Sequence, residues 1–406
     1  MKPVRIGMVG ARYGATVHLQ NLAPLRGTQV QVVGICSKSR ESAEACARRF
    51  EIPFVTTDLA ALLSRKDVDA VDMCVPTALH HVFAVQAAEA GKHVIVEKPL
   101  TGYFGERGDP EQIGEHVPRA NMLTGARKNT AAVLEAIRRC RVTLGYAENW
   151  VYAPPVEKLR RLIRASGGAI LDLRAEESHS GSHSPYSRHW RHTGGGTLLR
   201  MGVHPVGAVL HLNAYEGELH HGRPIRPLSV VADVAPLMRL EVAQREKKKW
   251  IPADPEDVEN WGSVLITFED GTKAVITVTD AGLGGLQEKV SVYMTNAVLH
   301  ANMAQNTAVQ TYAPDSSIFG DEYFTEKLET KGGWSFPSPD EDWFRGYPQE
   351  MRDFVDAIRE GREPLASATL AADCVEVIYA AYLSAEQGRR VSLSLLPGHT
   401  SDRPRG

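Results

Sequence analysis

Val4-Arg5-Ile6-Gly7-Met8-Val9-Gly10-Ala11-Arg12-Tyr13-Gly14-Ala15 predicts, in order, a short apolar strand, a glycine turn and the start of a helix. A dinucleotide-binding turn at such a place has the pattern G-x-G-x-x-G/A. Gly10 and Ala15 fit its first and third positions, and Arg12 stands where the second glycine belongs. Because a guanidinium attracts a pyrophosphate, we interpret Gly10, Arg12, Tyr13 and Ala15 as cofactor contacts. The alternative is an ordinary strand-to-helix turn.

The strand–helix alternation continues outward from this turn to about residue 98. Apolar runs predict strands, and segments with helical periodicity lie between them, which is typical of a doubly wound parallel sheet with helices on both faces. Glycines and prolines over residues 101–126 predict a lid-like loop, followed by a helix over 129–140. The predicted strands are 4–9, 30–36, 54–55, 70–75, 93–96 and 142–144, and the predicted helices between them are 40–50, 59–63 and 80–90.

From about residue 150 the pattern changes to one helix, 156–165, followed by strand-rich sequence. Strands over 170–175, 228–234, 264–268, 274–279 and 290–294 predict an α+β domain with a large, open, mostly antiparallel sheet. Helices over 349–360 and 366–388 and a strand over 391–395 follow. We therefore expect a Rossmann domain (1–145), an α+β substrate and oligomerisation domain (146–348), C-terminal helices that pack back on the Rossmann domain (349–395) and a tail (396–406).

Composition excludes several classes of protein. The 406 residues suggest two or three domains at roughly 150 residues each. The formal net charge of −3 gives no field that would hold nucleic acid or an anionic membrane. No apolar run reaches the roughly 18 residues of a membrane helix, and no secretory signal is visible. Five scattered cysteines without a C-x-x-C pair predict reduced thiols and a cytoplasmic location.

The end of the second strand bears on cofactor choice. An acidic residue there would accept the ribose 2′-hydroxyl of NAD. Ser37, Lys38 and Arg40 instead offer a hydroxyl and two cations, which favours the 2′-phosphate of NADP. The alternative is a solvated cation pair at a helix start.

Three motifs further along the chain carry a family resemblance. They are Pro76-Thr77-Ala78-Leu79-His80, Glu97-Lys98-Pro99-Leu100, and the run from Gly194-Gly195-Gly196 to Gly202-Val203-His204-Pro205. In this order they resemble the glucose–fructose oxidoreductase/inositol dehydrogenase (Gfo/Idh/MocA) family. The resemblance covers the first 100 or so residues closely and extends to the C-terminal helices. It implies a Rossmann domain followed by a domain with an open sheet that serves both the active site and subunit contacts.

The resemblance also implies site residues. Lys98 and His204 match the catalytic lysine and histidine, and Glu97 lies beside the nicotinamide in relatives. Pro76, Thr77 and His80 join the cofactor contacts, and His18 matches a position common in the first helix. A lysine and a histidine can each relay the proton that leaves a hydroxyl during hydride transfer. The alternatives are a surface lysine at Lys98 and a satisfied core histidine at His204.

Two departures from the family pattern concern the substrate. Arg200 and Gly207 stand where relatives often have aspartates. Our hypothesis is that Arg200 binds a substrate anion, most simply a carboxylate. The alternative is an internal pair with Glu148 or Glu176. Asn149, in the segment after the sixth strand, is a candidate for a substrate hydroxyl or the nicotinamide amide.

A histidine-rich segment precedes the three glycines. His179, His183 and Trp190 suggest a polar loop that contacts substrate hydroxyls and a ring face. We predict no metal; the alternative is a zinc site built from Glu148, His179, His183 and His204.

The expected function is hydride transfer between NAD(P), with NADP preferred, and a hydroxylated sugar, polyol or cyclic hydroxy acid. One alternative keeps the cofactor bound for transient oxidation followed by elimination or hydrolysis. Another is a non-catalytic dinucleotide-binding regulator. The expected partners are a small-molecule substrate and copies of the same chain, as a homodimer or homotetramer.

Overall fold

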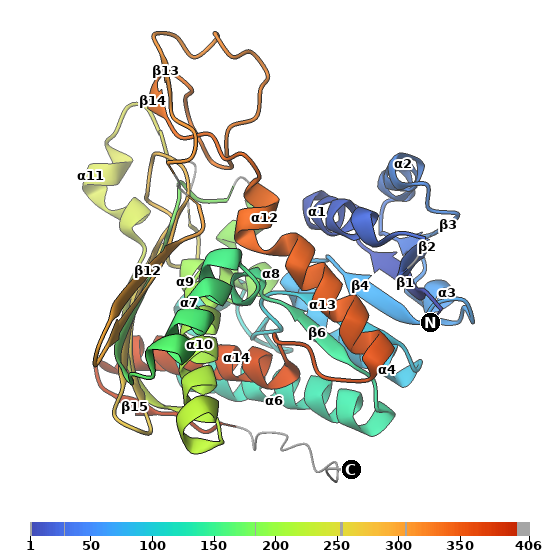
Figure 1. Cartoon of the computed structure of the whole chain (residues 1–406), viewed down its shortest axis with the longest axis horizontal. Helices are drawn as coiled ribbons and strands as arrows, with labels where there is room; N and C mark the ends of the chain where they lie inside the picture. Colours follow the sequence, from blue (N-terminus) through green and yellow to red (C-terminus); the bar gives the residue numbers. More distant parts are fainter. Residues whose placement is uncertain (1, 28, 183, 252–254, 305–306, 396–406) are drawn as a thin grey trace.

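The computed structural model describes residues 2–27, 29–182, 184–251, 255–304 and 307–395. Two sheets dominate the molecule, and long helices lie between them (Figure 1). The predicted fold class is confirmed: a parallel N-terminal sheet with helices, and a mostly antiparallel C-terminal sheet.

The N-terminal sheet has six parallel strands in the order β3-β2-β1-β4-β5-β6. The chain order reverses between β1 and β4, so the loops after these two strands diverge and leave a crevice at their carboxyl ends. This is where a dinucleotide binds in such folds. The strands are β1 (Val4–Val9), β2 (Val30–Cys36), β3 (Phe54–Thr56), β4 (Ala70–Met73), β5 (His93–Glu97) and β6 (Leu144–Ala147); the helices are α1 (Tyr13–Leu22), α2 (Arg40–Phe50), α3 (Leu59–Leu63) and α4 (His80–Glu89).

The region predicted as a loop over 101–126 is a loop only as far as Pro118, interrupted by the short α5 (Ile113–His116). Helix α6 (Arg119–Cys140) begins ten residues earlier than predicted. Gly125 caused the error, because it packs closely instead of breaking the helix: a Cβ there would lie 2.4 Å from the ring of Tyr103. The loop is also anchored, since Tyr103 N donates to Tyr379 Oη over 2.6 Å.

The C-terminal sheet has seven strands in the order β12-β11-β7-β10-β9-β8-β15. Strand β10 pairs parallel with β7, and the other pairings are antiparallel. The strands are β7 (Ile170–Ser178), β8 (Pro227–Ala235), β9 (Trp261–Phe268), β10 (Lys273–Thr279), β11 (Gln287–Met294), β12 (Val298–Asn302) and β15 (Val391–Ser392), the last shorter than the predicted 391–395.

One face of this sheet is buried under helices, and the other is not covered by any described element (Figure 1). Alternation along the strands sets the two faces: Leu173, Ala175 and Glu177 of β7 are buried, and Arg174 is exposed. The covering helices are α7 (Pro154–Ser166) and α10 (Val203–His221). The sequence reading missed α10 because its small and apolar residues surround the axis and show no amphipathic stripe.

The C-terminal helices join the two sheets. Helix α13 (Tyr347–Glu360) packs on α1, and α14 (Ala368–Gln387) lies between α6 and β8. By length and composition α14 could cross a membrane, but 67% of its most apolar window is buried in the interior. The predicted tail, 396–406, lies outside the described residues.

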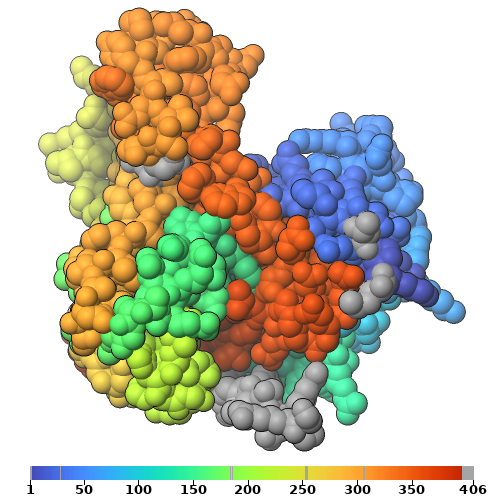
Figure 2. All heavy atoms as spheres, viewed as in Figure 1, coloured from blue at the N-terminus to red at the C-terminus, as the bar shows by residue number. Residues whose placement is uncertain are grey.

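A lobe built from residues 307–340 projects beyond the C-terminal sheet (Figure 1). It contains the short pair β13 (Thr311–Ala313) and β14 (Gly333–Ser335) and ends at α12 (Glu341–Arg345). Figure 2 shows a notch between this lobe, in orange, and the N-terminal domain, in blue. The notch opens above α12, close to the turn after β1.

Candidate active site

The turn after β1 has the backbone that a dinucleotide site needs. Gly10 has φ +115°, and a Cβ there would lie 2.1 Å from the carbonyl oxygen of Cys74. Only glycine fits both constraints. Arg12 is extended, with φ −108°, so the position of the second glycine does not require a left-handed residue. Arg12 and Tyr13 are exposed at the start of α1, and Ala15 is buried beneath them.

The end of β2 presents its polar residues to solvent. Lys38 and Arg40 are exposed and Ser37 is half-buried. Arg40 pairs with Glu44 over 3.1 Å on the surface of α2, and Lys38 has no ion pair within the described chain. Lys38 therefore remains available beside Ser37, and Arg40 is held only by a pair at the exposed surface.

The residues of the motif after β4 lie in two different environments. Pro76 and Thr77 lie in the turn between β4 and α4, where the crevice is. His80 is buried, with Nδ1 2.8 Å from Pro99 O and Nε2 2.9 Å from Val75 O. Its ring ties the ends of β4 and β5 together and does not reach toward a cofactor, in contrast to the role expected from the sequence.

A buried line of charged groups supports Glu97 at the end of β5. Asp72 Oδ1 lies 2.9 Å from His18 Nδ1, and His18 Nε2 lies 3.1 Å from Glu97 Oε1. Burial opposes a charge on His18, but Asp72 outweighs it and raises the pKa of the imidazole well above its usual value. Burial likewise opposes the charge on Glu97, yet its bond to His18 lowers the carboxyl pKa to about 2. An imidazolium between two carboxylates thus fixes α1 against β4 and β5.

Lys98 makes hydrogen bonds in both domains. Its Nζ donates to the carbonyl oxygen of Arg200 over 2.8 Å, and its backbone N donates to Glu97 Oε2 over 3.0 Å. The half-buried side chain therefore leaves the dinucleotide crevice and ends beside the helical segment that precedes α10. This placement differs from that of a solvated surface lysine.

His204, in the first turn of α10, is paired with Glu148. His204 Nδ1 lies 2.8 Å from Glu148 Oε1, and Trp150 stacks on the ring at 5.7 Å. Burial lowers the pKa of His204 well below its usual value and raises that of Glu148 to about 8. Both groups are consequently neutral near pH 7, with a proton held between them. The sequence reading considered Glu148 only as a metal ligand or as a partner of Arg200.

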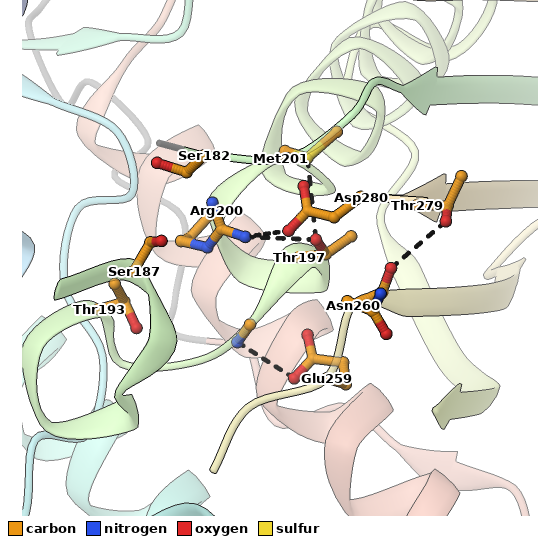
Figure 3. Close-up of polar contacts among 12 residues, drawn as sticks. Ser182, Ser187, Thr193, Thr197, Arg200, Met201, Glu259, Asn260, Thr279 and Asp280 are labelled. Atoms are coloured by element: carbon orange, nitrogen blue, oxygen red, sulfur yellow. Dashed lines mark hydrogen bonds and ion pairs between the residues drawn. The ribbon is translucent and has the colours of Figure 1, made fainter. Parts of the chain in front are cut away.

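Glu259 organises the glycine run that leads to Arg200. Its carboxylate accepts from Gly196 N over 3.1 Å and from Leu198 N over 2.8 Å, and Tyr382 donates to it over 2.9 Å. These bonds orient the short helix α9 (Thr197–Arg200), and Figure 3 shows Glu259 close to Thr197.

Arg200 has an internal partner. Its guanidinium points at the buried carboxylate of Asp280 and forms an ion pair with it (Figure 3). The alternative of internal pairing is therefore the arrangement observed, but with Asp280 in place of Glu148 or Glu176. Because Asp280 neutralises its charge, Arg200 offers little attraction to a substrate anion. His179 lies beside this pair, 3.8 Å from Asp280, and burial lowers its pKa to about 4.

Two proposed substrate residues lie away from this cluster. Asn149 is buried and donates to the carbonyl oxygen of Arg345 over 2.8 Å. Trp190 is 1% exposed, packed between Tyr382 and the guanidinium of Arg119, so it is a core residue and presents no ring face to a substrate. The expected ring contact of Trp190 is therefore wrong, because burial depends on distant segments, whereas the substrate or nicotinamide contact of Asn149 stays a prediction. His183 lies outside the described residues.

The candidate zinc ligands do not gather. Glu148 and His204 pair with each other, whereas His179 neighbours Asp280. Among the described residues, the group with metal-like spacing is His18, Asp72 and Cys74, and it belongs to the charged line described above.

Sequence reasoning missed Glu177, Glu288 and Arg345. Glu177 and Glu288 are directly opposed on β7 and β11, both on the helix-covered face. Arg345 of α12 lies 3.0 Å from Glu288. The strand alternation held a signal, since Glu177 occupies the register of the buried Leu173 and Ala175.

We predict that His18→Gln destabilises the protein in a pH-dependent manner. The folded-state pKa of His18 is above the value of about 6.5 in the unfolded chain, so its stabilisation is complete below pH 6.5 and falls as the pH rises toward the folded pKa. At pH 6 the loss should be roughly 3–5 kcal/mol, the usual cost of removing one partner of a buried ion pair. Melting temperatures from pH 5.5 to 9 measure it. The exposed control His220→Gln should show a small, constant difference; a His18→Gln gap that does not narrow above pH 6.5 contradicts the charged line.

Comparison with known proteins agrees with this architecture. The model of an oxidoreductase family with an NAD-binding Rossmann fold matches residues 4–121, and the GFO/IDH/MocA C-terminal domain matches residues 156–300. The chain is 31% identical to dTDP-3,4-didehydro-2,6-dideoxy-alpha-D-glucose 3-reductase of Streptomyces violaceoruber, over 51% of this chain and 53% of that protein. It is 26% identical to levoglucosan dehydrogenase of Pseudarthrobacter phenanthrenivorans, over 69% and 68%.

Among solved structures, GenD2 from gentamicin A biosynthesis in complex with NAD superposes with a TM-score of 0.75. The match covers 97% of both chains at 26% identity. Together with the two family models, it shows that the chain belongs to the GFO/IDH/MocA family of NAD-binding oxidoreductases.

Proposed function

We propose that the protein is an NAD(P)-dependent dehydrogenase or reductase acting on a secondary hydroxyl of a sugar-like or polyol ring. The observation that carries the proposal is the position of Lys98. It follows the last residue of β5, at the crevice of the Rossmann sheet, and its Nζ bonds to the carbonyl oxygen of Arg200 in the second domain. A group in that place can reach a substrate held between the domains.

The residues around the crevice fit a dinucleotide. Gly10 brings the backbone turn close to β4, so a pyrophosphate can approach the start of α1. When bound there, NAD(P) supplies the acceptor or donor of the hydride. Glu97, fixed through His18, would border the nicotinamide end.

The chain's own groups would handle the proton. Lys98 takes the hydroxyl proton during oxidation and returns it during reduction, oriented by its bond to Arg200 O. With Glu148 donating to Nδ1, neutral His204 carries its hydrogen on Nε2, where it can donate to the substrate oxygen. Trp150 holds the ring in place from one face.

The relatives support a sugar-derived substrate. Levoglucosan dehydrogenase and the dTDP-sugar 3-reductase are both named for such compounds, and GenD2 belongs to the biosynthesis of gentamicin A. The buried Arg200–Asp280 pair argues against a hydroxy acid held by Arg200.

Lys98→Met should lower kcat for hydride transfer by about 10²-fold or more, as expected on loss of a general acid–base. Dinucleotide affinity should stay within about twofold, because the crevice is unchanged. The measurement is absorbance at 340 nm with cyclic polyols and pyranoses, beside fluorescence titration of the dinucleotide. Lys128→Met, at an exposed lysine of α6, is the control. Full activity of Lys98→Met would remove Lys98 from the mechanism; a wild-type protein that binds dinucleotide and turns over no member of the panel would favour a regulator.

We further propose that NADP is preferred over NAD, because Lys38 and Arg40 are exposed beside Ser37. Ser37→Asp should reverse the preference by repelling a 2′-phosphate and accepting a ribose hydroxyl. Fluorescence titration with NADPH and NADH tests this, with the exposed Ser64→Asp as a control of equal charge change. Tighter NADH binding by the wild type would overturn the preference.

We also propose that the protein works in the cytoplasm as a homodimer or homotetramer formed through the outer face of the C-terminal sheet. Val231 and Leu265 are directly paired on that face, and Leu228 nearby is 53% exposed. An uncovered apolar sheet face favours association. Val231→Lys should reduce the mass measured by light scattering, whereas Val242→Lys on α11 (Glu241–Gln244) should not. A monomeric wild type would overturn the proposal.

A further inference from the structure

At one end of the neighbouring strands β11, β7 and β10, the C-terminal sheet carries a row of acidic groups. Glu288 of β11 and Glu177 of β7 are directly opposed, and Asp280 follows the end of the neighbouring β10. All three occupy the helix-covered face, and their exposed fractions are 0%, 3% and 2%. The row therefore lies where the substrate of the proposed oxidoreductase would meet the second domain.

Two opposed carboxylates in a buried register are costly. Like charges directly across an antiparallel pair repel each other, and burial penalises each of them. Burial raises the pKa of Glu288 to about 7, and burial together with Glu288 raises that of Glu177 well above its usual value. A strand that needed only packing would have apolar residues here, as at Val290 and Val292 on the same face.

Two arginines beside this row are already engaged. Arg345 lies 3.0 Å from Glu288, 2.9 Å from Glu326 and 3.9 Å from Glu341, so one guanidinium faces three carboxylates. Arg200 is neutralised by Asp280.

Lys98 and Arg345 are cations whose charges act on Glu177. The charge of Lys98 also acts on Glu288, Glu148 and His204, so the lysine that is proposed to meet the substrate lies within electrostatic range of these groups.

Several carboxyl oxygens in this cluster accept no hydrogen bond. Oε2 of Glu177, of Glu288 and of Glu148 are buried and have no hydrogen-bond partner among the described residues. A buried acceptor without a donor is rare and costs stability unless a ligand supplies the donor. Two of these oxygens belong to the opposed pair of Glu177 and Glu288, which favours a ligand group rich in N–H donors at that pair.

We propose that the substrate is a hydroxylated ring bearing a protonated amine, an amino sugar or aminocyclitol, whose ammonium is bound by Glu177 and Glu288 while its reacting hydroxyl meets Lys98 and His204. This inference rests on the proposed hydride-transfer function and adds the substrate's charge. A neutral hydroxyl can donate one hydrogen bond to one carboxylate, whereas an ammonium donates three and offsets the repulsion of the pair. Arg200 alone predicted a negatively charged substrate, whereas the acidic pair favours a positively charged one.

The test compares matched rings that differ in one substituent. Calorimetric titration of the protein saturated with its dinucleotide uses D-glucosamine, D-glucose and D-glucuronate, and separately 2-deoxystreptamine and myo-inositol. We expect the amine-bearing member of at least one set to bind about tenfold or more tighter than its neutral counterpart, because a charge-assisted hydrogen bond at a desolvated site is roughly twice as strong as a neutral one. D-glucuronate should bind most weakly.

Variants separate charge recognition from folding. Glu177→Gln and Glu288→Gln should each reduce the preference for the amine by about tenfold while dinucleotide affinity is retained. Glu176→Gln, the adjacent carboxylate on the opposite face of β7, is the matched control and should keep the preference. If Glu177→Gln fails to fold, the preference of the wild type over the matched rings still decides the question.

The outcomes distinguish this inference from the proposed function. Oxidation of neutral rings without a preference for amines overturns the inference and leaves the proposed function standing. Absence of binding by every amine-bearing probe also overturns it. If the protein binds no dinucleotide, or its Lys98→Met variant is unimpaired, the proposed function fails first. A preference that survives in both glutamine variants places amine recognition elsewhere and contradicts the assignment.

Discussion

The line Asp72–His18–Glu97 is the interaction on which the candidate site depends. It joins β4, α1 and β5 through a buried imidazolium, with distances of 2.9 and 3.1 Å. Its position fixes the first helix, whose start borders the pyrophosphate site, and the carboxylate that precedes Lys98. A parallel sheet brings these elements to one edge, but their relative angle is set by the side chains between them. Removal of one member would leave a buried charge without its partner.

In contrast to this line of charged groups, the contact between the domains relies on backbone atoms and on helices that pack on both domains. Lys98 reaches a carbonyl oxygen, and α14 packs on α6 of one domain and on β8 of the other. A carbonyl acceptor orients the amine without an ion pair that would hold its charge. The arrangement suits a group that must accept and return a proton.

Acidic groups in the second domain are concentrated at one end of the central strands of the sheet. Asp280, Glu177 and Glu288 are aligned by strand register, and two arginines are already paired with members of the row. The charge of the site therefore depends on which carboxylates the strand register aligns. A single cation in a motif does not predict that charge.

The sequence by itself determined the alternating strands and helices of the first domain and the turn at Gly10, and its motifs marked Lys98 and His204 as candidate catalytic groups through the family resemblance. These depend on local periodicity and on motifs whose spacing is short. Only the tertiary structure decided that Arg200 pairs with Asp280, 80 residues away, that Glu148 binds His204, and that Glu177 opposes Glu288. It also placed Trp190 and Asn149 in the interior. The physical reason is that a side chain's partner and burial are set by strand register and helix packing between distant segments, which local patterns do not encode.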